Sequence, residues 1–469
     1  MRVGIIGAGP AGLTAAELIS RAGHEVVVYE ADNTVGGMAK TFDLWGQKVD
    51  LGPHRFFSSD PRINAVWLKA VAGDYDLVRR LTRIFYKKRF FYYPLKPFDA
   101  LKKLGPVETA RCMFDYLCEK VSPTAQDGSF ETWVAHRFGY RLYEVFFKTY
   151  TEKLWGINCS ELDADFAAQR IKKLSLTSAI WNALTKGRGN KHKTLVDQFA
   201  YPHGGAGMPY QRMADSIIKN GGKVLLSTSV KRVVTESGCA VGIEAEVGGV
   251  ERFDHVISTM PLPHLVERLE GTPIVVQENV KKLGFRNTIL VYLKIEAQNL
   301  FSDNWLYVHS PDLQTGRLTN FRNWTPKING AETSTIVVLE YWCYDNDSLW
   351  KSSDAELVEL GNNELKKTGL IGEAPISAGF VKRIHNSYPV YRRGYKDVLV
   401  PVVEYLKTIK RLTLIGRSGS FKYNNQDHSI LMGVLAAENL LEDANHDLWL
   451  VNTDDEYQES GSLQKSGLS

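Results

Sequence analysis

The chain has 469 residues, of which 44% are hydrophobic and 23% charged, a balance typical of a globular protein with two or three packed subdomains. A formal net charge of only +4 argues against nucleic acid as a partner, so any anion specificity must come from local arginines. Five cysteines without CxxC or metal-ligand spacing predict neither a disulfide framework nor a metal site, and they favour a reducing cytoplasm.

The first thirty residues predict a strand, a tight turn, a helix and a second strand, and not a signal peptide. Gly7 permits the turn, Gly9 lets a pyrophosphate approach the backbone, and Gly12 lets helix and strand pack closely. Glu30 ends the second strand, where its carboxylate can accept hydrogen bonds from an adenosine ribose. We therefore expect an adenine dinucleotide without a 2′-phosphate.

A second glycine turn decides between NAD and FAD. Gly36, Gly37 and Lys40 follow the acidic strand, and close backbone approach with a cation beside the pyrophosphate suits a longer, buried cofactor. No second unit of strand, GxGxxG and helix appears downstream, so a separate nicotinamide domain is not expected. The predicted cofactor is FAD.

In the middle of the chain the predicted secondary structure changes from mainly helical to mainly strand. The pattern is mainly helical to about residue 184, apart from an aromatic, basic stretch at 79–95. This stretch fits a nucleotide-stacking wall, a membrane-surface patch or a hairpin turning at Lys87 and Lys88, and the hairpin is favoured. Alternating apolar and polar residues from 270 to 395 indicate an antiparallel sheet. No run of eighteen apolar residues predicts a membrane span.

The segment from Leu412 to Leu441 completes the predicted flavin site. A buried strand over 412–416 is followed by helical spacing from Ser429, with Asp427 at the expected N-cap. A helix starting here can direct free N–H groups and its positive dipole end at the flavin pyrimidine, which favours the reduced anion. An ordinary core strand and helix would give the same pattern, but Gly416 and Arg417 make the connection more open than that requires.

These elements predict an α/β fold with a Rossmann-like FAD-binding domain, a helical substrate-capping domain and an antiparallel β-sheet domain. The predicted boundaries are 1–65, 195–268 and 396–442 for a discontinuous FAD-binding domain, 66–194 for the helical domain, 269–395 for the sheet domain and 443–469 for a flexible tail.

Six segments spread over residues 1 to about 442 resemble motifs of UDP-galactopyranose mutases, flavoenzymes of the amine oxidase and protoporphyrinogen oxidase superfamily. In chain order they are DLGPHRFF (50–57, flavin histidine loop), YTEKLWG (150–156, helix end with the substrate tryptophan), WLYVHSPD (305–312) and GRLTNFRNWTP (316–326, tyrosine and arginine for the diphosphate), SYPVY (387–391, tyrosine loop) and GRSGSFKYNNQDHS (416–429, C-terminal flavin motif, most similar to eukaryotic members). The basic segment 185–194 departs from the family pattern, which leaves the base and the sugar open.

The resemblance implies a nucleotide-sugar mutase that interconverts UDP-galactopyranose and UDP-galactofuranose, or a related UDP-hexose, by attack of reduced flavin N5 on the anomeric carbon. Arginine suits the diphosphate because its planar fork binds phosphate oxygens bidentately. The implied catalytic residues are Arg317, Arg170, His54, Tyr388 and Tyr423, and the implied substrate-binding residues are Tyr307, Tyr93, Trp155 and Asn323. The candidate cofactor-binding residues are Gly7, Gly9, Gly12, Glu30, Gly36, Gly37, Lys40, Gly416, Arg417, Asn425, Gln426, Asp427 and Ser429.

Two alternatives stay open. An FAD-dependent oxidoreductase of the protoporphyrinogen oxidase or amine oxidase type has the same flavin motifs, and a non-catalytic binding protein like the GDP-dissociation inhibitors shares the fold. NAD(P)H could act as a transient reductant, and a homo-oligomer is left open. Arg317 could also be an ordinary strand arginine, and His54 a hydrogen-bonded core histidine.

Overall fold

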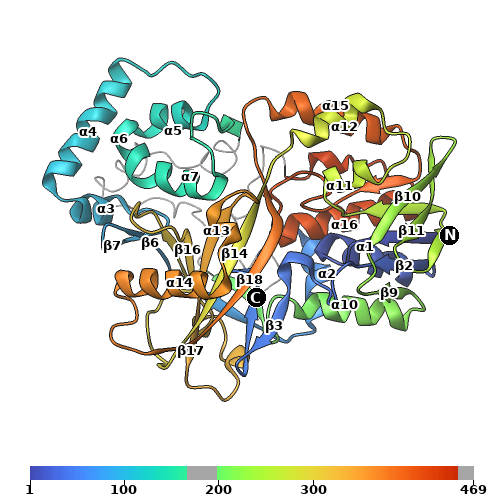
Figure 1. Cartoon of the computed structure of the whole chain (residues 1–469), viewed down its shortest axis with the longest axis horizontal. Coiled ribbons are helices and arrows are strands. Elements are labelled where there is room, and N and C mark those ends of the chain that lie inside the picture. Colours follow the sequence, from blue (N-terminus) through green and yellow to red (C-terminus); the bar gives the residue numbers. More distant parts are fainter. Residues whose placement is uncertain (166–197, 453–469) are drawn as a thin grey trace. The chain divides into compact units, whose positions relative to one another are not determined.

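A computed structural model describes residues 1–165 and 198–452 of the chain (Figure 1). The chain divides into two compact units: Met1–Val78, Phe199–Gly284 and Tyr395–Ser469 form the first, and Arg79–Gln198 and Phe285–Gly394 form the second. The residues for which separate helical and sheet domains were expected thus fall largely within one unit. Arg170 and the basic segment 185–194 lie outside the described residues.

The first unit is built on a parallel sheet of five strands in the order β19-β13-β1-β2-β9. The strands are β1 (Arg2–Ile6), β2 (Glu25–Tyr29), β9 (Lys223–Leu225), β13 (His255–Ser258) and β19 (Leu412–Leu414). The run Val26–Val28 is fully buried, as expected for a parallel strand covered on both faces. The strand expected at 412–416 is confirmed, although it ends at Leu414.

Four helices complete the core of the first unit (Figure 1). They are α1 (Pro10–Arg21), α2 (Pro61–Val71), α10 (Met208–Lys219) and α16 (Gln426–Leu441). Helix α16 approaches α1 closely, since a Cβ atom placed on Gly433 would lie 2.6 Å from the carbonyl oxygen of Ala11. This contact joins the two ends of the chain in one nucleotide-binding fold.

The remaining elements of the first unit are peripheral. They are the hairpin β3 (Thr41–Leu44) and β4 (Gln47–Asp50), the pair β5 (Tyr75–Arg79) and β8 (Gln198–Pro202), the antiparallel sheet β10 (Val230–Glu236), β11 (Cys239–Ala245) and β12 (Gly249–Arg252), and the helices α11 (Leu262–Glu267), α12 (Ile274–Lys281) and α15 (Tyr395–Lys407). Residues 443–452 differ from the expected solvated tail, because Leu448 and Val451 are buried in the core of this unit.

The second unit contains a sheet of seven strands in the order β18-β14-β17-β16-β15-β6-β7. The strands are β6 (Thr82–Tyr86), β7 (Arg89–Tyr92), β14 (Phe285–Ile295), β15 (Trp305–Val308), β16 (Arg317–Asn320), β17 (Thr335–Cys343) and β18 (Ile376–Pro389). Every pair is antiparallel except β6 and β15, which confirms the expected antiparallel sheet. The expected hairpin is also confirmed, since Lys87 and Lys88 turn with φ of 47° and 61° between β6 and β7.

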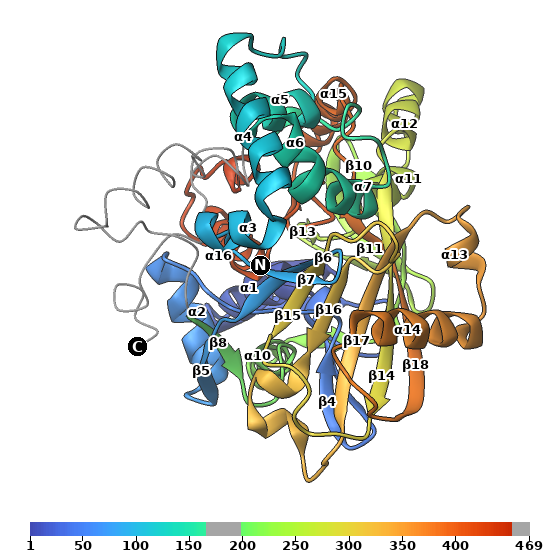
Figure 2. The same ribbon diagram turned by 90° about the vertical axis from the view of Figure 1, so that its left-hand side faces the viewer.

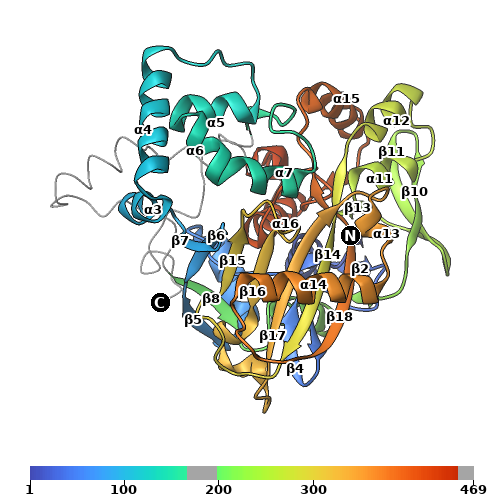
Figure 3. The ribbon, with the colours of Figure 1, turned by 60° about the vertical axis from the view of Figure 1, so that its left-hand side comes forward.

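The two faces of this sheet have different partners. Side chains alternate along each strand, so Leu306, Leu318 and Leu339 share one face, and this face packs against helix α14 (Asp354–Thr368). Figure 3 shows α14 lying across β17 and β14. The opposite face carries Tyr307 and Arg317 and is the one that bears the candidate site.

In the second unit, helices α3 to α6 lie on the β6–β7 side of the sheet (Figures 2 and 3), whereas α7 places Tyr150 and Trp155 against Trp342 on β17 and Tyr388 on β18. All five helices α3 to α7 belong to this unit. They are α3 (Pro97–Leu104), α4 (Pro106–Val121), α5 (Phe130–Phe138), α6 (Tyr140–Tyr143) and α7 (Thr149–Trp155), with a short π-helix (Glu144–Lys148) before α7. Helix α13 (Ser348–Lys351) lies on the connection from β17 to α14. No helix in residues 1–165 or 198–452 is both long and apolar enough to cross a membrane.

Candidate functional site

The turn between β1 and α1 leaves a backbone surface without side chains. Gly7 has a φ of 98°, and a Cβ atom on Gly12 would lie 2.1 Å from the Gly7 carbonyl oxygen, so both positions require glycine. Helix α1 starts after Gly9 with Pro10 in its first turn and has no side-chain cap. Its first N–H groups therefore remain available to an anion such as a pyrophosphate.

The second glycine turn packs directly against the first. The Gly36 N–H donates to the carbonyl of Ala8 at 2.8 Å, and Gly36 has a φ of 105°. A Cβ atom on Gly37 would lie 3.1 Å from the Cα of Gly9. The two turns form a cradle that side chains would fill, and its chemistry fits the pyrophosphate of FAD.

Glu30 and Lys40 lie at the edge of this cradle, at the ends of β2 and of the second turn. The Glu30 carboxylate accepts hydrogen bonds from the N–H groups of Ala8 at 2.7 Å and Asp32 at 3.0 Å. Lys40, which was expected beside the pyrophosphate, forms an ion pair with Asp32. Glu30 is thus held at the carboxyl end of the sheet, where dinucleotides bind in this class of fold.

The C-terminal turn packs on the start of α1. Gly416 has a φ of 84°, and a Cβ atom there would lie 3.3 Å from the Cβ of Ala11. Arg417 donates to the carbonyl of Asn424 at 2.9 Å, and its guanidinium lies 4.4 Å from the ring centre of Tyr423. Arg417 and Tyr423 therefore stabilise the loop before α16, which is the loop that the flavin motif predicted.

The start of α16 differs from the expected one by two residues. Its N-cap is Asn425, whose extended backbone donates its N–H to Nδ1 of His428 at 3.2 Å. Asp427 lies inside the first turn and is buried, and Ser429 is buried one turn on, donating its N–H to the Asn425 carbonyl at 3.1 Å. Burial alone would raise the pKa of Asp427, but His428 outweighs it and the net pKa is lowered. The sequence pattern missed the cap because His428 takes the reciprocal role usually held by Glu or Gln.

Gln426 connects the flavin motif to the histidine loop. Its side-chain amide donates to the carbonyl of His54 at 3.2 Å and accepts from the hydroxyl of Tyr210 at 2.6 Å. The His54 ring contacts the carbonyl of Leu51 at 3.0 Å through Nε2. Gln426 thus fixes the loop that carries His54 at the N-terminus of α16.

In the second unit, strand register brings two of the predicted residues together with a third that was not predicted. Tyr307 on β15 lies opposite Arg317 on β16, which lies opposite Glu340 on β17. Directly opposed residues present their side chains on the same face of a sheet. The register therefore lines up a phenol, a guanidinium and a carboxylate across three neighbouring strands.

Arg317 and Glu340 form a buried, two-pronged ion pair. Nε and Nη2 of Arg317 donate to the two carboxylate oxygens at 2.7 and 2.5 Å, and Nη2 lies 3.5 Å from the hydroxyl of Tyr388. Burial lowers the pKa of Arg317, but Glu340 and Tyr388 outweigh it and hold the pKa well above its ordinary value. Nη1 has no hydrogen-bond partner among the residues that the structure describes, so this edge of a fixed cation is available to a ligand.

Aromatic rings surround this ion pair. The Tyr307 ring lies 5.0 Å from Tyr93 and 5.4 Å from Tyr150 on α7, and the Tyr388 ring lies 6.2 Å from Trp155 and 6.1 Å from Trp342, all as ring-centre distances with edge-to-face geometry. We call Tyr93, Tyr150, Trp155, Tyr307, Arg317, Glu340, Trp342 and Tyr388 the arginine cluster.

Four of the predicted catalytic and substrate-binding residues do not belong to the arginine cluster. Two of them, His54 and Tyr423, lie in the first unit. Asn323 donates its amide to the carbonyls of Phe301 and Asp303 at 2.7 and 2.8 Å and so holds the turn before β15, and Arg170 is outside the described residues. Three members were missed: Glu340, Tyr150 and Trp342. A lone carboxylate in the apolar run TIVVLEYWC could have indicated Glu340, because a buried strand rarely carries an unpaired charge.

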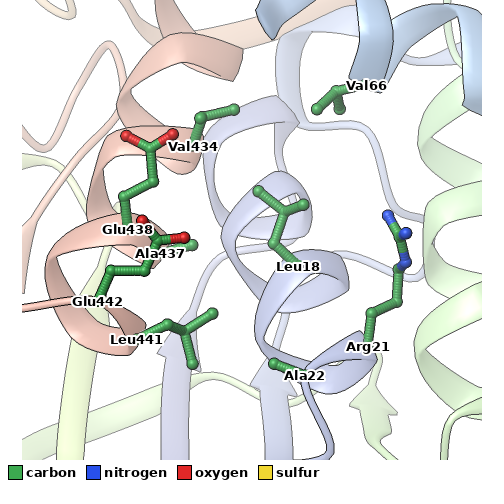
Figure 4. A pocket seen from close by; sticks show the side chains of 9 residues that line it. All are labelled: Leu18, Arg21, Ala22, Val66, Val434, Ala437, Glu438, Leu441 and Glu442. Carbon is green, nitrogen blue, oxygen red and sulfur yellow. The ribbon is translucent and has the colours of Figure 1, made fainter.

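A pocket of about 360 Å³ in the first unit lies elsewhere (Figure 4). It is lined by Leu18, Arg21, Ala22, Val66, Val434, Ala437, Glu438, Leu441 and Glu442. Apart from Val66 on α2, these residues lie in or directly after the C-terminal halves of α1 and α16, whereas the first glycine turn and the Gly416 turn precede these helices. This pocket is therefore distinct from the dinucleotide cradle.

Comparisons with known proteins agree on the fold. A crystal structure of reduced UDP-galactopyranose mutase is similar with a TM-score of 0.83 and 23% identity over 96% of each chain. The cyclohexylamine oxidase of Brevibacterium oxydans is similar with a TM-score of 0.66 and 17% identity over 94% of this chain and 99% of that chain. In sequence, coproporphyrinogen III oxidase of Staphylococcus aureus is 22% identical over 94% of this chain and 98% of its own length.

The family is decided by a match that spans most of the chain. The model of the flavin containing amine oxidoreductases matches residues 10–441, from the start of α1 to the end of α16. The matched region includes the second glycine turn, the C-terminal flavin loop and the arginine cluster. The chain belongs to the flavin containing amine oxidoreductase family.

Proposed function

We propose that this protein is an FAD-dependent mutase that interconverts the pyranose and furanose forms of a UDP-hexose, with UDP-galactose as the first candidate. The observation that carries the proposal is the arginine cluster: a buried cation with a free edge, two adjacent phenols and aromatic walls. Flavoenzymes that oxidise apolar substrates have no need for such a clamp, whereas a nucleotide diphosphate does.

The cluster has the chemistry that a diphosphate requires. Glu340 fixes the guanidinium plane of Arg317 through two hydrogen bonds, so little conformational entropy is lost when Nη1 and Nη2 meet phosphate oxygens. The hydroxyls of Tyr307 and Tyr388 lie on the same face and can donate to the same group. As the bond to the sugar breaks, negative charge grows on the diphosphate, and these fixed donors stabilise it.

An unsatisfied donor supports a polar ligand here. The indole N–H of Trp342 is buried without a hydrogen-bond partner in the described part of the chain. Such a group costs free energy unless a water or ligand satisfies it. Trp342 lies 6.1 Å from Tyr388 between ring centres, so a sugar or phosphate oxygen bound at the cluster is a suitable acceptor.

The first unit would hold FAD. The two glycine turns would bind the pyrophosphate, Glu30 the adenosine ribose, and the N-terminus of α16 the flavin pyrimidine. When bound and reduced, the flavin would supply the nucleophile for the anomeric carbon. The chain's own contribution is to bind and orient the cofactor and, through the dipole of α16, to favour its reduced anion.

A flavin-dependent oxidoreductase is the second candidate, favoured by the Staphylococcus aureus oxidase relative, which aligns with 94% of the chain. One experiment separates the two. Purified protein is reduced with dithionite without oxygen, given UDP-galactofuranose, and the products are resolved by chromatography; a parallel aerobic sample is assayed for hydrogen peroxide with porphyrinogen and amine substrates. Conversion to UDP-galactopyranose by the reduced protein alone supports the mutase. Peroxide formation with an unchanged nucleotide sugar contradicts it.

A further inference from the structure

The backbone of the loop between β15 and β16 is held by two charged side chains, and binding of a diphosphate does not by itself explain why. Residues 309–316 connect Tyr307 to Arg317, and two charged side chains, one partly buried and one buried, reach this loop from opposite faces of the sheet. Lys153 comes from α7, on the face of the arginine cluster, and Glu364 comes from α14, on the opposite face. The two charges contact the loop backbone rather than each other.

Lys153 binds the carbonyl side of the loop. Its ammonium donates to the carbonyls of Val308 at 3.1 Å, Ser310 at 2.7 Å and Thr315 at 3.3 Å. These three oxygens belong to both ends of the loop, so a single ammonium holds the ends together. Burial lowers the pKa of Lys153 to about 8, yet the group stays charged at neutral pH and keeps all three donors.

Glu364 binds the N–H side of the loop. It is 3% exposed, and its carboxylate accepts from the N–H groups of Gln314 at 2.5 Å and Thr315 at 2.9 Å and from the hydroxyl of Tyr341 at 3.1 Å. Thr315 is thus held through its carbonyl by Lys153 and through its N–H by Glu364. Because Arg317 is only two residues further on, these contacts to Thr315 also fix the position of the Arg317 backbone.

The same helix that supplies Lys153 also supplies rings of the cluster. Tyr150 and Trp155 lie on α7, and Arg286 fixes the end of that helix by donating to the carbonyls of Lys153 at 3.2 Å and Trp342 at 2.5 Å. Gly156, with a φ of 65°, lies so close to Arg286 that a Cβ atom there would be 2.3 Å from the guanidinium. The helix end and the loop are therefore held as one body.

We propose that Lys153 and Glu364 are positioning residues, which set the separation and orientation of Tyr307 and Arg317 for a nucleoside diphosphate by clamping the 309–316 loop from both sides of the sheet. This inference rests on the proposed function for the identity of the ligand. It adds two residues that touch neither ligand nor cofactor and act only through the loop.

The test compares Lys153→Met, Lys153→Arg and Glu364→Gln with wild type, all as flavin-loaded protein. Amide hydrogen exchange is measured for the peptide covering 308–317, and UDP affinity by calorimetry. Lys153→Met and Glu364→Gln are expected to speed exchange in this peptide, and to weaken UDP binding about tenfold, the effect of losing charge-assisted hydrogen bonds. Lys153→Arg should restore most of the affinity, because it returns the charge.

A matched control separates positioning from general destabilisation. Lys294 on β14 of the same sheet pairs with Glu332 at 3.4 Å, away from the loop, and Lys294→Met should leave both readouts unchanged. Unchanged exchange and unchanged UDP affinity in Lys153→Met and Glu364→Gln would overturn the inference, as would a lower melting temperature with wild-type affinity. A wild-type protein that binds no UDP would overturn the proposed function, whereas the exchange comparison would still decide whether the two residues hold the loop.

Discussion

The two units build their sites from different material. In the first, backbone groups form the site: glycines at positions 7, 9, 12, 36 and 37 bring two turns together and leave N–H groups exposed. In the second, side chains form the site: strand register brings Arg317 and Glu340 together, and the hydroxyl of Tyr388 on β18 reaches Arg317. A backbone site should therefore fail where an added side chain has no room, and a side-chain site should fail when one partner is removed.

The largest effect is expected from adding one methyl group to the backbone site. In Gly12→Ala the new Cβ would meet the Gly7 carbonyl oxygen at 2.1 Å, and this backbone atom cannot move without opening the turn. We expect flavin content to fall to less than about a tenth of wild type, measured by the absorbance of bound flavin. The control is Gly23→Ala, at a left-handed glycine with open space around it. Equal loss of flavin in both variants would mean that strain, and not closeness, explains the site.

The next largest effect is expected from removing one partner from the side-chain site, and it is a loss of folding stability. Glu340→Ala leaves the guanidinium of Arg317 buried without its carboxylate, which destabilises a protein by about 3 to 5 kcal/mol. Urea denaturation measures the loss. Glu332→Ala removes a more exposed partner of Lys294 in the same sheet and should cost less than about 0.5 kcal/mol. Similar losses in the two variants would show that the buried Arg317–Glu340 pair contributes no more to the free energy of unfolding than an exposed pair.

The first unit also depends on one buried carboxylate, which gives it a pH dependence. Asp50 accepts from the Tyr201 hydroxyl at 2.7 Å and the Ala206 N–H at 3.1 Å, and burial raises its pKa from 3.8 to about 7. The folded state therefore binds the proton more tightly. The stability from this proton is complete below pH 3.8 and is lost as pH rises through about 7.

Asp50→Asn should remove that loss. Between pH 4 and pH 8 the stability of the variant relative to wild type should rise by about 2 to 4 kcal/mol, measured from denaturation midpoints across this range. A constant difference between the two proteins would show that Asp50 is ionised in the folded state throughout.

The smallest effect concerns the hydroxyl beside Arg317. Tyr388→Phe removes a group 3.5 Å from Nη2 and keeps the ring that packs against Trp155. We expect turnover to fall about fivefold to tenfold, because one lost hydrogen bond raises the activation free energy by about 1 kcal/mol. Folding stability should be unchanged. Tyr86→Phe on β6 is the control. A variant with wild-type turnover would remove Tyr388 from the proposed clamp.

The contrast also explains what the sequence could predict. The glycine turns, β1, α1 and the C-terminal strand and helix follow local patterns, and the structure contains them with small shifts in their ends. The cap of α16 was misplaced because His428 takes an unusual role in it. Glu340 was missed because its partner lies 23 residues away, and only the register of β16 and β17 brings the two together. The clamp by Lys153 and Glu364 depends on helices packed on opposite faces, which no local pattern contains.

The central claim is that the first unit binds FAD and the arginine cluster of the second unit binds the diphosphate. Its most direct test measures UDP binding and flavin content together on wild type and Arg317→Lys. Lysine keeps the charge but loses the planar fork. We predict that the variant keeps about one flavin per chain and binds UDP at least tenfold more weakly than wild type, since two charge-assisted hydrogen bonds lose their geometry. Wild-type affinity for UDP in Arg317→Lys, with flavin retained, would contradict the assignment of the diphosphate to this cluster.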